Sequence, residues 1–388
     1  MKPTWRWFGE FDKITLPEIR QTGATGIVTA LHGIPAGEVW PRDEIAEKKS
    51  TLQAAGFDWS VVESLPVHEE IKTSGPDRHR YFANYRQSLA NLAAEGVTTV
   101  CYNFMPLLDW TRTDLHAPVA TGGTCLRFDA AKMYAFERFM VGRDVADGAY
   151  SAVARQRGSD WFAGATQDDQ DKLLAAIMSG LPGAFDRYDI RNLKNALSRY
   201  DRIGKAELRS SYRDFLTEIL PSAEELGISM CVHPDDPPRD LLGLPRIVST
   251  QDDIAWIMGA VDSAANGLTL CTGSLGAHPD NDLPAIASRF SERVRFAHLR
   301  NVRKEPDGSF EEASHLDGDV DLVAVVAALM AEEKRADAAP IPFRPDHGHE
   351  LLCDAERDAA PGYPLVGRLR GMAELRGIIA ALEQSIRT

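Results

Sequence analysis

The sequence has no hydrophobic run long enough to cross a membrane. Its longest apolar segment, Leu322–Ala331, is about half the length that a membrane-spanning helix needs. The first residues, Met1–Lys13, contain no apolar stretch of the kind that secretory signal peptides carry. We therefore expect neither export nor a membrane partner.

Cysteine is scarce and irregularly spaced. The five cysteines form no CxxC pair and no pattern typical of a disulfide framework. They are Cys101, Cys125, Cys231, Cys271 and Cys353. Because free thiols are typical of a reducing compartment, the sequence predicts a cytoplasmic protein.

Positive charge is also in deficit. The chain has 43 lysines and arginines against 57 aspartates and glutamates, which leaves a formal net charge of −14. An acidic surface of this kind repels nucleic acid, which we exclude as a partner. Hydrophobic residues make up 44% of the 388 residues, enough for a large core in several domains or in one α/β barrel.

Short, nearly continuous apolar segments alternate with helical patterns along the chain, as expected for parallel strands buried on both faces. The predicted strands are Gly26–Ala30, Trp59–Glu63, Thr98–Tyr102, Ile228–Val232, Arg246–Ser249, Leu268–Cys271, Val294–Ala297 and Ile341–Arg344. Eight such units predict an α/β fold of the (β/α)₈ TIM-barrel type. An open doubly wound sheet is the competing architecture, but no GxGxxG or GxxxxGKS/T motif follows these segments.

One connection is much longer than a barrel requires. About 120 residues separate the third predicted strand from the fourth, and a barrel helix near Ser210–Leu226 accounts for only part of them. The remainder, residues 129–208, is rich in Ala, Asp, Arg and Gln and is interpreted as a helical insertion. We therefore predict a single domain over residues 1–388 with an embedded helical cap after strand three.

Four residues that can bind metal lie at or just after the ends of predicted strands: His233, Cys271, His298 and Asp346. In a barrel, the carboxyl ends of all strands open on one face. Each residue alone has an ordinary explanation, because free cysteine is usually a core residue and an aspartate before a glycine often belongs to a turn. Together, two His, one Cys and one Asp predict a divalent-metal site with open positions for substrate.

Charged neighbours of these positions indicate an anionic substrate. Arg344 lies two residues before Asp346, and Arg300 lies two residues after His298. Arginine is suited to bidentate binding of carboxylates, so both are candidates for a carboxylate clamp. Other residues have less specific interpretations: His32 and His68 as rim residues, His315 as a loop or supporting residue, Asp235 and Asp236 as turn residues, and Trp5–Phe8 as a plug or a lead-in to the first strand.

Several segments together resemble the mannonate dehydratase family. They are Thr4–Trp7, Gly23–His32, Cys101–Pro106, Asp109–Asp114, His233–Pro238, Cys271–Ser274 and Arg344–His349. The resemblance runs from about residue 3 to near the C-terminus and includes the insertion. It implies a barrel similar to the xylose isomerase-like group. It also implies dehydration of D-mannonate to 2-dehydro-3-deoxy-D-gluconate in glucuronate and hexuronate catabolism.

The resemblance also implies roles for individual residues. Mn²⁺ or Fe²⁺ would be held by His233, Cys271, His298 and Asp346. His347 and Tyr363 would be the catalytic pair, with Arg344 assisting. Arg344, Arg300, Asn103, Trp110 and His32 are the predicted substrate-binding residues. The sequence leaves open which of His347 and Tyr363 is the base and which the acid, and we expect a homo-oligomer, most simply a dimer.

Three other interpretations compete with a dehydratase. A metal-dependent sugar isomerase or epimerase on the same barrel would act on an aldose and need no carboxylate clamp. A non-catalytic sugar-acid binding protein would bind without turnover. An accidental core cluster would hold no metal. The ligand set itself favours Fe²⁺, Co²⁺ or Zn²⁺, because Mn²⁺ prefers oxygen ligands.

Overall fold

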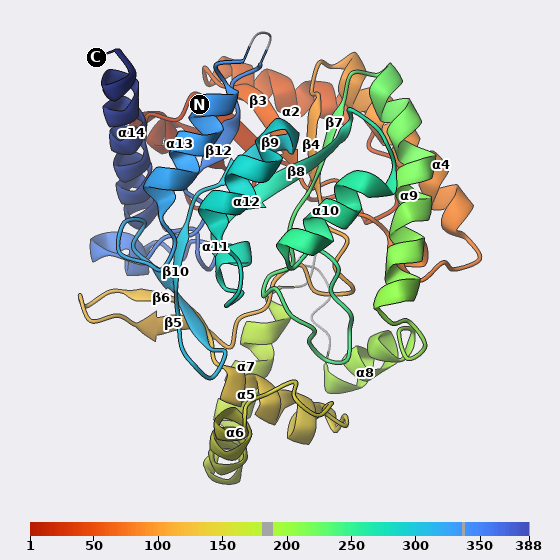
Figure 1. Cartoon of the computed structure of the whole chain (residues 1–388), viewed down its shortest axis with the longest axis vertical. Coiled ribbons are helices and arrows are strands. Elements are labelled where there is room, and N and C mark those ends of the chain that lie inside the picture. Colours follow the sequence, from red (N-terminus) through yellow and green to blue (C-terminus); the bar gives the residue numbers. More distant parts are fainter. Residues whose placement is uncertain (181–188, 336–337, 388) are drawn as a thin grey trace.

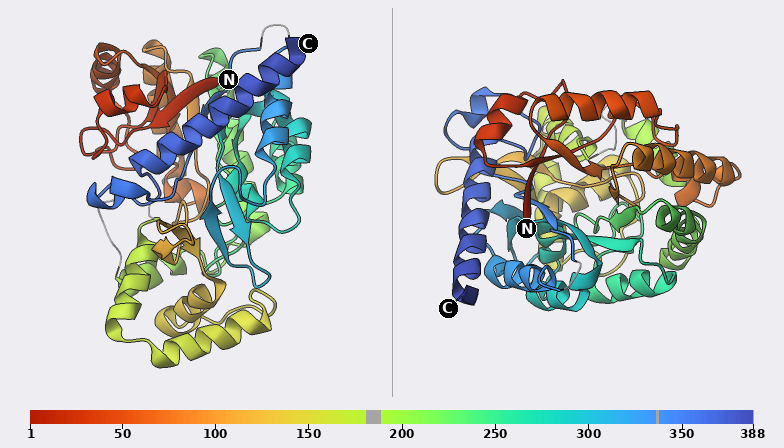
Figure 2. Two further views of the ribbon diagram at one scale, coloured as in Figure 1. Left: turned by 90° about the vertical axis from the view of Figure 1, so that its left-hand side faces the viewer. Right: turned by 90° about the horizontal axis from the view of Figure 1, so that it is seen from above.

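Eight parallel strands in the described part of the chain close into a barrel (Figures 1 and 2). The structure is a computed structural model that describes residues 1–180, 189–335 and 338–387. Around the barrel the order is β1-β12-β9-β8-β7-β4-β3-β2. The strands are β1 Lys2–Arg6, β2 Gly26–Thr29, β3 Asp58–Glu63, β4 Thr99–Tyr102, β7 Ser229–Val232, β8 Asn266–Cys271, β9 Val294–His298 and β12 Pro342–Arg344. The predicted (β/α)₈ barrel is confirmed.

Helices surround the barrel and bury the outward faces of its strands. They are α1 Leu16–Gln21, α2 Arg42–Ala54, α3 Glu69–Lys72, α4 Arg78–Ala94, α9 Lys205–Glu225, α10 Gln251–Ala260, α11 Thr272–Gly276, α12 Leu283–Phe290, α13 Leu322–Glu332 and α14 Leu365–Arg387. Inward-facing residues fill the barrel itself: Val28, Val61, Cys101, Cys231 and Phe296. None of the helices in the described ranges is long and apolar enough to cross a membrane.

Two of the strand assignments differ from the prediction. Lys2–Arg6 is a barrel strand and not a plug, and it pairs with both β2 and β12. Arg246–Ser249 is wrong as a strand, because side chains of the preceding turn bind its backbone. Arg246 N donates to Asp240 Oδ1 at 2.8 Å, and Val248 N donates to Asp235 Oδ2 at 2.7 Å.

The long connection follows β4, which corresponds to the predicted strand Thr98–Tyr102. This strand is the fourth of the barrel and not the third, because β1 was not predicted. It begins with the hairpin β5 Asp114–Pro118 and β6 Thr124–Phe128, which the sequence reading missed. The helical segments that follow are α5 Ala130–Ala135, the π-helical turn Phe136–Val141, α6 Ala152–Gly164, α7 Gln167–Met178 and α8 Ile190–Ser198. Residues 181–188 of the predicted insertion lie outside the described residues. The role of these helices as a cap stays a prediction.

A second, antiparallel sheet joins this connection to the loop after β9. Its order is β10-β11-β6-β5, with β10 Asn301–Lys304 and β11 Phe310–Ala313. In Figure 1 this sheet lies between the barrel and the lower helices α5 to α7. A separate apolar cluster, which includes Phe128, Phe136 and Phe310, packs the sheet against these helices. This antiparallel sheet therefore lies beside the carboxyl ends of the barrel strands.

Candidate active site

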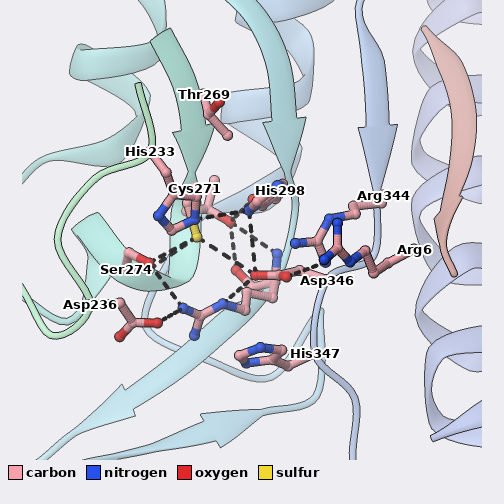
Figure 3. Close-up of polar contacts among 12 residues, drawn as sticks. Arg6, His233, Asp236, Thr269, Cys271, Ser274, His298, Arg344, Asp346 and His347 are labelled. Atoms are coloured by element: carbon pink, nitrogen blue, oxygen red, sulfur yellow. Dashed lines mark hydrogen bonds and ion pairs between the residues drawn. The ribbon is translucent and has the colours of Figure 1, made fainter. Parts of the chain in front are cut away.

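The four predicted metal ligands converge at the carboxyl end of the barrel (Figure 3). His233 follows β7, Cys271 ends β8, His298 ends β9 and Asp346 follows β12. His233 Nε2 lies 3.1 Å from His298 Nδ1, and Asp346 Oδ2 lies 3.7 Å from Cys271 Sγ and 3.8 Å from His298 Nδ1. One ligand atom from each of His233, Cys271 and His298 lies within 4.8 Å of the others.

The hydrogen bonds around this cluster turn lone pairs toward its centre. His233 Nδ1 lies 2.7 Å from the carbonyl oxygen of Pro234, so the proton belongs there and Nε2 is free to accept. His298 Nε2 lies 3.2 Å from Glu63 Oε1 without hydrogen-bond geometry, and the carboxylate favours the tautomer that carries the proton on Nε2, which leaves Nδ1 free. The two free nitrogens then face each other with no proton between them, an arrangement that a cation stabilises.

The other two donors suit a cation equally well. The sulfur of Cys271 accepts hydrogen bonds from the amide and the hydroxyl of Ser274, at 3.4 and 3.1 Å, and such bonds stabilise negative charge on sulfur. Asp346 adopts a left-handed φ of 60°, a conformation that is uncommon outside glycine and recurs at functional sites. Burial alone would raise the pKa of Asp346, but Arg344 and nearby cations hold it well below its ordinary value. The donor set therefore fits a divalent metal.

Burial lowers the pKa of His233. A neutral imidazole is the form that binds metal. The lowered pKa therefore favours the ligand state near neutral pH.

Arg300 lies beneath the cluster and is fully engaged with the protein. Its Nε donates to Asp346 at 2.6 Å, Nη1 donates to both oxygens of Glu312 at 2.6 and 2.8 Å, and Nη2 donates to Asp236 at 2.7 Å and to Ser274 at 3.1 Å. A guanidinium has five N–H donors, and all five are used. The bond to Asp346 fixes the orientation of that carboxylate, and contact of Arg300 with substrate, which would require breaking one of these bonds, stays a prediction.

Arg344 is also buried among carboxylates. Its Nε and Nη2 donate to Glu63 at 3.0 and 2.9 Å, and its Nη1 donates to Asp346. The ring of Tyr363 lies 5.6 Å from the guanidinium carbon. Because one N–H on each terminal nitrogen is not engaged by these bonds, a direct role of Arg344 toward substrate stays a prediction.

Glu312, on β11, is a site residue that the sequence reading missed. Its carboxylate lies 3.1 Å from His347 Nδ1 and accepts a hydrogen bond from Arg112 at 2.8 Å, in addition to those from Arg300. Burial alone would raise the pKa of Glu312, but Arg300, His347 and Arg112 lower it well below its ordinary value. Nothing in the local sequence marks Glu312, because its strand belongs to a sheet outside the barrel.

His347 stands among aromatic rings. The ring of Tyr363 lies edge-on at 5.1 Å and that of Trp110 at 6.3 Å. Burial raises the pKa of Tyr363, although Arg344 opposes this, so its phenol keeps its proton. The structure thus places the predicted catalytic pair together beside Asp346.

The remaining predicted substrate residues lie farther from the ligand cluster or nearer the rim. Asn103, just after β4, binds the side chain of Asp109, and burial raises the pKa of that carboxyl. His32 follows β2, with its ring 5.8 Å from that of Phe8, and burial lowers the pKa of His32 to about 3. His68 stacks on Tyr81 at 3.6 Å. Contacts of Asn103, Trp110 and His32 with substrate stay predictions.

Comparisons with known proteins agree over the whole chain. The family model described as D-mannonate dehydratase (UxuA) matches residues 1–388. A mannonate dehydratase from Chromohalobacter salexigens is 52% identical over 388 residues, which cover 99% of each chain. The crystal structure of mannonate dehydratase from Streptococcus suis serotype 2 has a TM-score of 0.78 at 33% identity, covering 100% of this chain and 95% of that one.

The fold is shared more widely. A xylose isomerase domain protein from Alicyclobacillus acidocaldarius has a TM-score of 0.52 at 15% identity and covers 99% of both chains. At that identity the likeness concerns the fold alone, and it agrees with the closed parallel barrel. The match over the full length places the chain itself more narrowly: it belongs to the D-mannonate dehydratase family.

Proposed function

We propose that the chain dehydrates D-mannonate to 2-dehydro-3-deoxy-D-gluconate at this site, with a divalent metal, Mn²⁺ or Fe²⁺, held by His233, Cys271, His298 and Asp346. The observation that carries the proposal is the convergence of these four donors in a chain that matches the dehydratase family over its full length. Bound there, such a metal supplies Lewis-acid stabilisation of the negative charge that develops on the substrate.

His347 is the candidate base that removes the C2 proton. Glu312 lies 3.1 Å from Nδ1 and accepts a hydrogen bond from the N–H at that nitrogen. The lone pair of Nε2 is therefore free. The same carboxylate stabilises the imidazolium that forms when Nε2 takes the proton, as an acidic partner does for other catalytic histidines.

Tyr363 is the candidate acid that protonates the leaving C3 hydroxyl. Its raised pKa keeps the phenol protonated, and its ring lies beside that of His347. Arg344, 5.6 Å from the ring, stabilises the phenolate that remains after transfer.

The steps balance without a further reactant. The C2–H bond breaks as its proton moves to His347 Nε2, its electron pair forms the C2–C3 double bond, and the C3–O bond breaks as the oxygen takes the proton of Tyr363 and leaves as water. The enol then takes up a proton at C3 and loses one from the C2 hydroxyl, which gives the 2-keto acid. One proton returns to Tyr363 and one leaves His347, so both residues regain their starting states.

The test is an assay of the 2-keto-3-deoxy product from D-mannonate, D-gluconate and other aldonates, with Mn²⁺- or Fe²⁺-loaded protein. We expect product from D-mannonate, its loss in EDTA and its recovery when either metal is added back. Product formation that EDTA leaves unchanged would refute the metal site. Absence of product from every aldonate, with turnover of an aldose instead, would replace the dehydratase with an isomerase.

We further infer that this reaction serves hexuronate breakdown in the cytoplasm, with the chain acting as a dimer. All five cysteines are free thiols, Cys271 among them, and a thiol ligand of this kind requires reducing conditions. Light scattering of the purified protein tests the dimer directly, because a monomer mass at micromolar concentration would contradict it.

A further inference from the structure

Arg6 is a buried arginine of the barrel interior that the proposed mechanism leaves without a task. It ends β1 and pairs in register with Val28, a residue that points into the barrel. Neighbouring residues in register on parallel strands share a face, so Arg6 also points inward. Its exposed fraction is only 9%, and Figure 3 shows its guanidinium next to that of Arg344.

The guanidinium of Arg6 is incompletely satisfied. Its Nη1 has no hydrogen-bond partner among the described residues, and its approach to Glu63 Oε2 is long, at 3.8 Å. Glu63 already accepts two shorter bonds from Arg344. A buried donor on a charged group that lacks a partner is costly, and at Arg6 this donor lies beside the candidate active site.

A second buried nitrogen that lacks a partner within the described ranges lies just after the neighbouring strand. His32 follows β2, and its Nε2 is buried with no partner in the described part of the chain. Phe8 contacts both residues, with its ring 4.8 Å from the Arg6 guanidinium carbon and 5.8 Å from the His32 ring. The same Phe8 ring lies 4.9 Å from that of Tyr363, and Arg6 is close enough to Tyr363 for their charges to interact.

We propose that Arg6 and His32 form the subsite that binds the carboxylate of the substrate. The proposal rests on the dehydratase function and names the residues that make it selective for an acid. The guanidinium of Arg6 and the Nε2 of His32, in the tautomer that carries its proton there, suit two carboxylate oxygens, and a charge-assisted bond from arginine is the stronger kind. Arg300 is less suited, because its five donors are bound to protein.

The charges around the site support an anion at this place. Five buried guanidiniums, of Arg6, Arg112, Arg300, Arg344 and Arg368, accompany four carboxylates, of Glu63, Asp236, Glu312 and Asp346. With a dication bound beside a thiolate, the net charge of the site would be positive. A substrate carboxylate reduces that excess.

The test compares a charged and a neutral ligand of the same carbon skeleton. The Michaelis constant for D-mannonate and the inhibition constant for D-mannonamide are measured for the metal-loaded wild type, Arg6→Met and Arg6→Lys. Arg209→Met is the matched control, because Arg209 also has a buried Nε without a partner among the described residues but lies on α9 outside the barrel. Metal content and thermal unfolding are recorded for each variant.

We expect Arg6→Met to raise the Michaelis constant for D-mannonate about 10- to 100-fold, the loss typical of a hydrogen bond to a charged group. Binding of D-mannonamide should change less than about threefold. Arg6→Lys should give an intermediate value, and Arg209→Met should resemble the wild type. If Arg6→Met fails to fold, the Arg6→Lys variant decides. We then expect its Michaelis constant for D-mannonate to rise at least about fivefold, with no comparable rise in the inhibition constant for D-mannonamide.

Two results would overturn the assignment. One is an Arg6 variant whose Michaelis constant for D-mannonate stays within about threefold of the wild type. The other is an equal loss of binding for the acid and the amide, which would show structural damage in place of charge recognition. Failure of the dehydratase function itself is distinct, because the wild type would then form no product from D-mannonate.

Discussion

Replacing Glu312 by Gln tests how the site orients its base. The change keeps the shape of the side chain but puts an amide next to His347 Nδ1. An amide N–H donated to Nδ1 favours the tautomer that carries its proton on Nε2, which is the wrong form for a base. A wrong tautomer of a catalytic histidine costs about 10⁴-fold in kcat in serine proteases, and we expect a loss of about 10²–10⁴-fold here.

The same change weakens the fold by a separate route. Glu312 is the shared partner of Arg112 and Arg300, whose bonds to it measure 2.6 to 2.8 Å and are buried. Breaking a buried ion pair from one side costs about 3–5 kcal/mol, and the retained amide oxygen should keep the loss of unfolding free energy at the lower end of that range. The Michaelis constant and the metal content should stay near wild type, because Glu312 touches neither metal ligand donors nor the proposed carboxylate subsite.

A double-mutant cycle separates the two effects. His347→Asn should reduce turnover to a small residual rate while leaving metal bound. If Glu312 acts on turnover through His347, adding Glu312→Gln to His347→Asn should lower kcat no further. The measurements are steady-state kinetics on D-mannonate and urea unfolding of all four proteins. A Glu312→Gln enzyme with kcat within about threefold of wild type, or a double variant with fully additive losses, would refute this role.

Two further predictions concern the metal and the pH dependence of stability. Cys271→Ser should lower the metal content of purified protein and the activity together, as measured by plasma emission spectrometry and the product assay, and unchanged metal would contradict the ligand assignment. Because burial lowers the pKa of His32 to about 3, against about 6.5 when unfolded, the unfolded chain binds a proton that the folded chain excludes between these pH values. The contribution of His32 to the free energy of unfolding is fully present above about pH 6.5. It falls by about 1.4 kcal/mol for each pH unit below that. His32→Gln should therefore flatten the urea-unfolding free energy against pH by about that slope from pH 6 to 4, and identical slopes would refute the argument.

Much of the barrel could be predicted because its signals are local. Seven of the eight barrel strands can be recognised in the sequence as short apolar runs. Thr250 and Asp253 form the capping box that begins α10. The candidate ligands follow from the same reading, since the ends of parallel strands meet on one face. The first strand was missed because Lys2–Arg6 offers Trp5 as its one large apolar side chain, and its inward residues Thr4 and Arg6 are polar although buried.

The rest depends on pairings that no local pattern contains. Arg246–Ser249 has the composition of a strand, yet Asp235 accepts hydrogen bonds from the backbone N–H of Val248 and from the hydroxyl of Ser249. Whether an arginine near the site is free or engaged also cannot be read from spacing. Arg300 and Arg6 differ in the number of carboxylates around them, and those carboxylates come from distant segments of the chain.

The hairpin of β10 and β11 shows how such a pairing reaches the chemistry. Side chains alternate along β11, so Phe310 and Glu312 share the buried face while Glu311 turns away toward Arg127. Phe310 stacks on Phe128 of β6 with ring centres 5.4 Å apart, and both rings are buried. A slip of one residue would expose Phe310 and replace Glu312 by a neighbour that faces the other way. The aromatic pair therefore fixes the register that delivers a carboxylate to His347, and the orientation of the base depends on apolar packing outside the barrel.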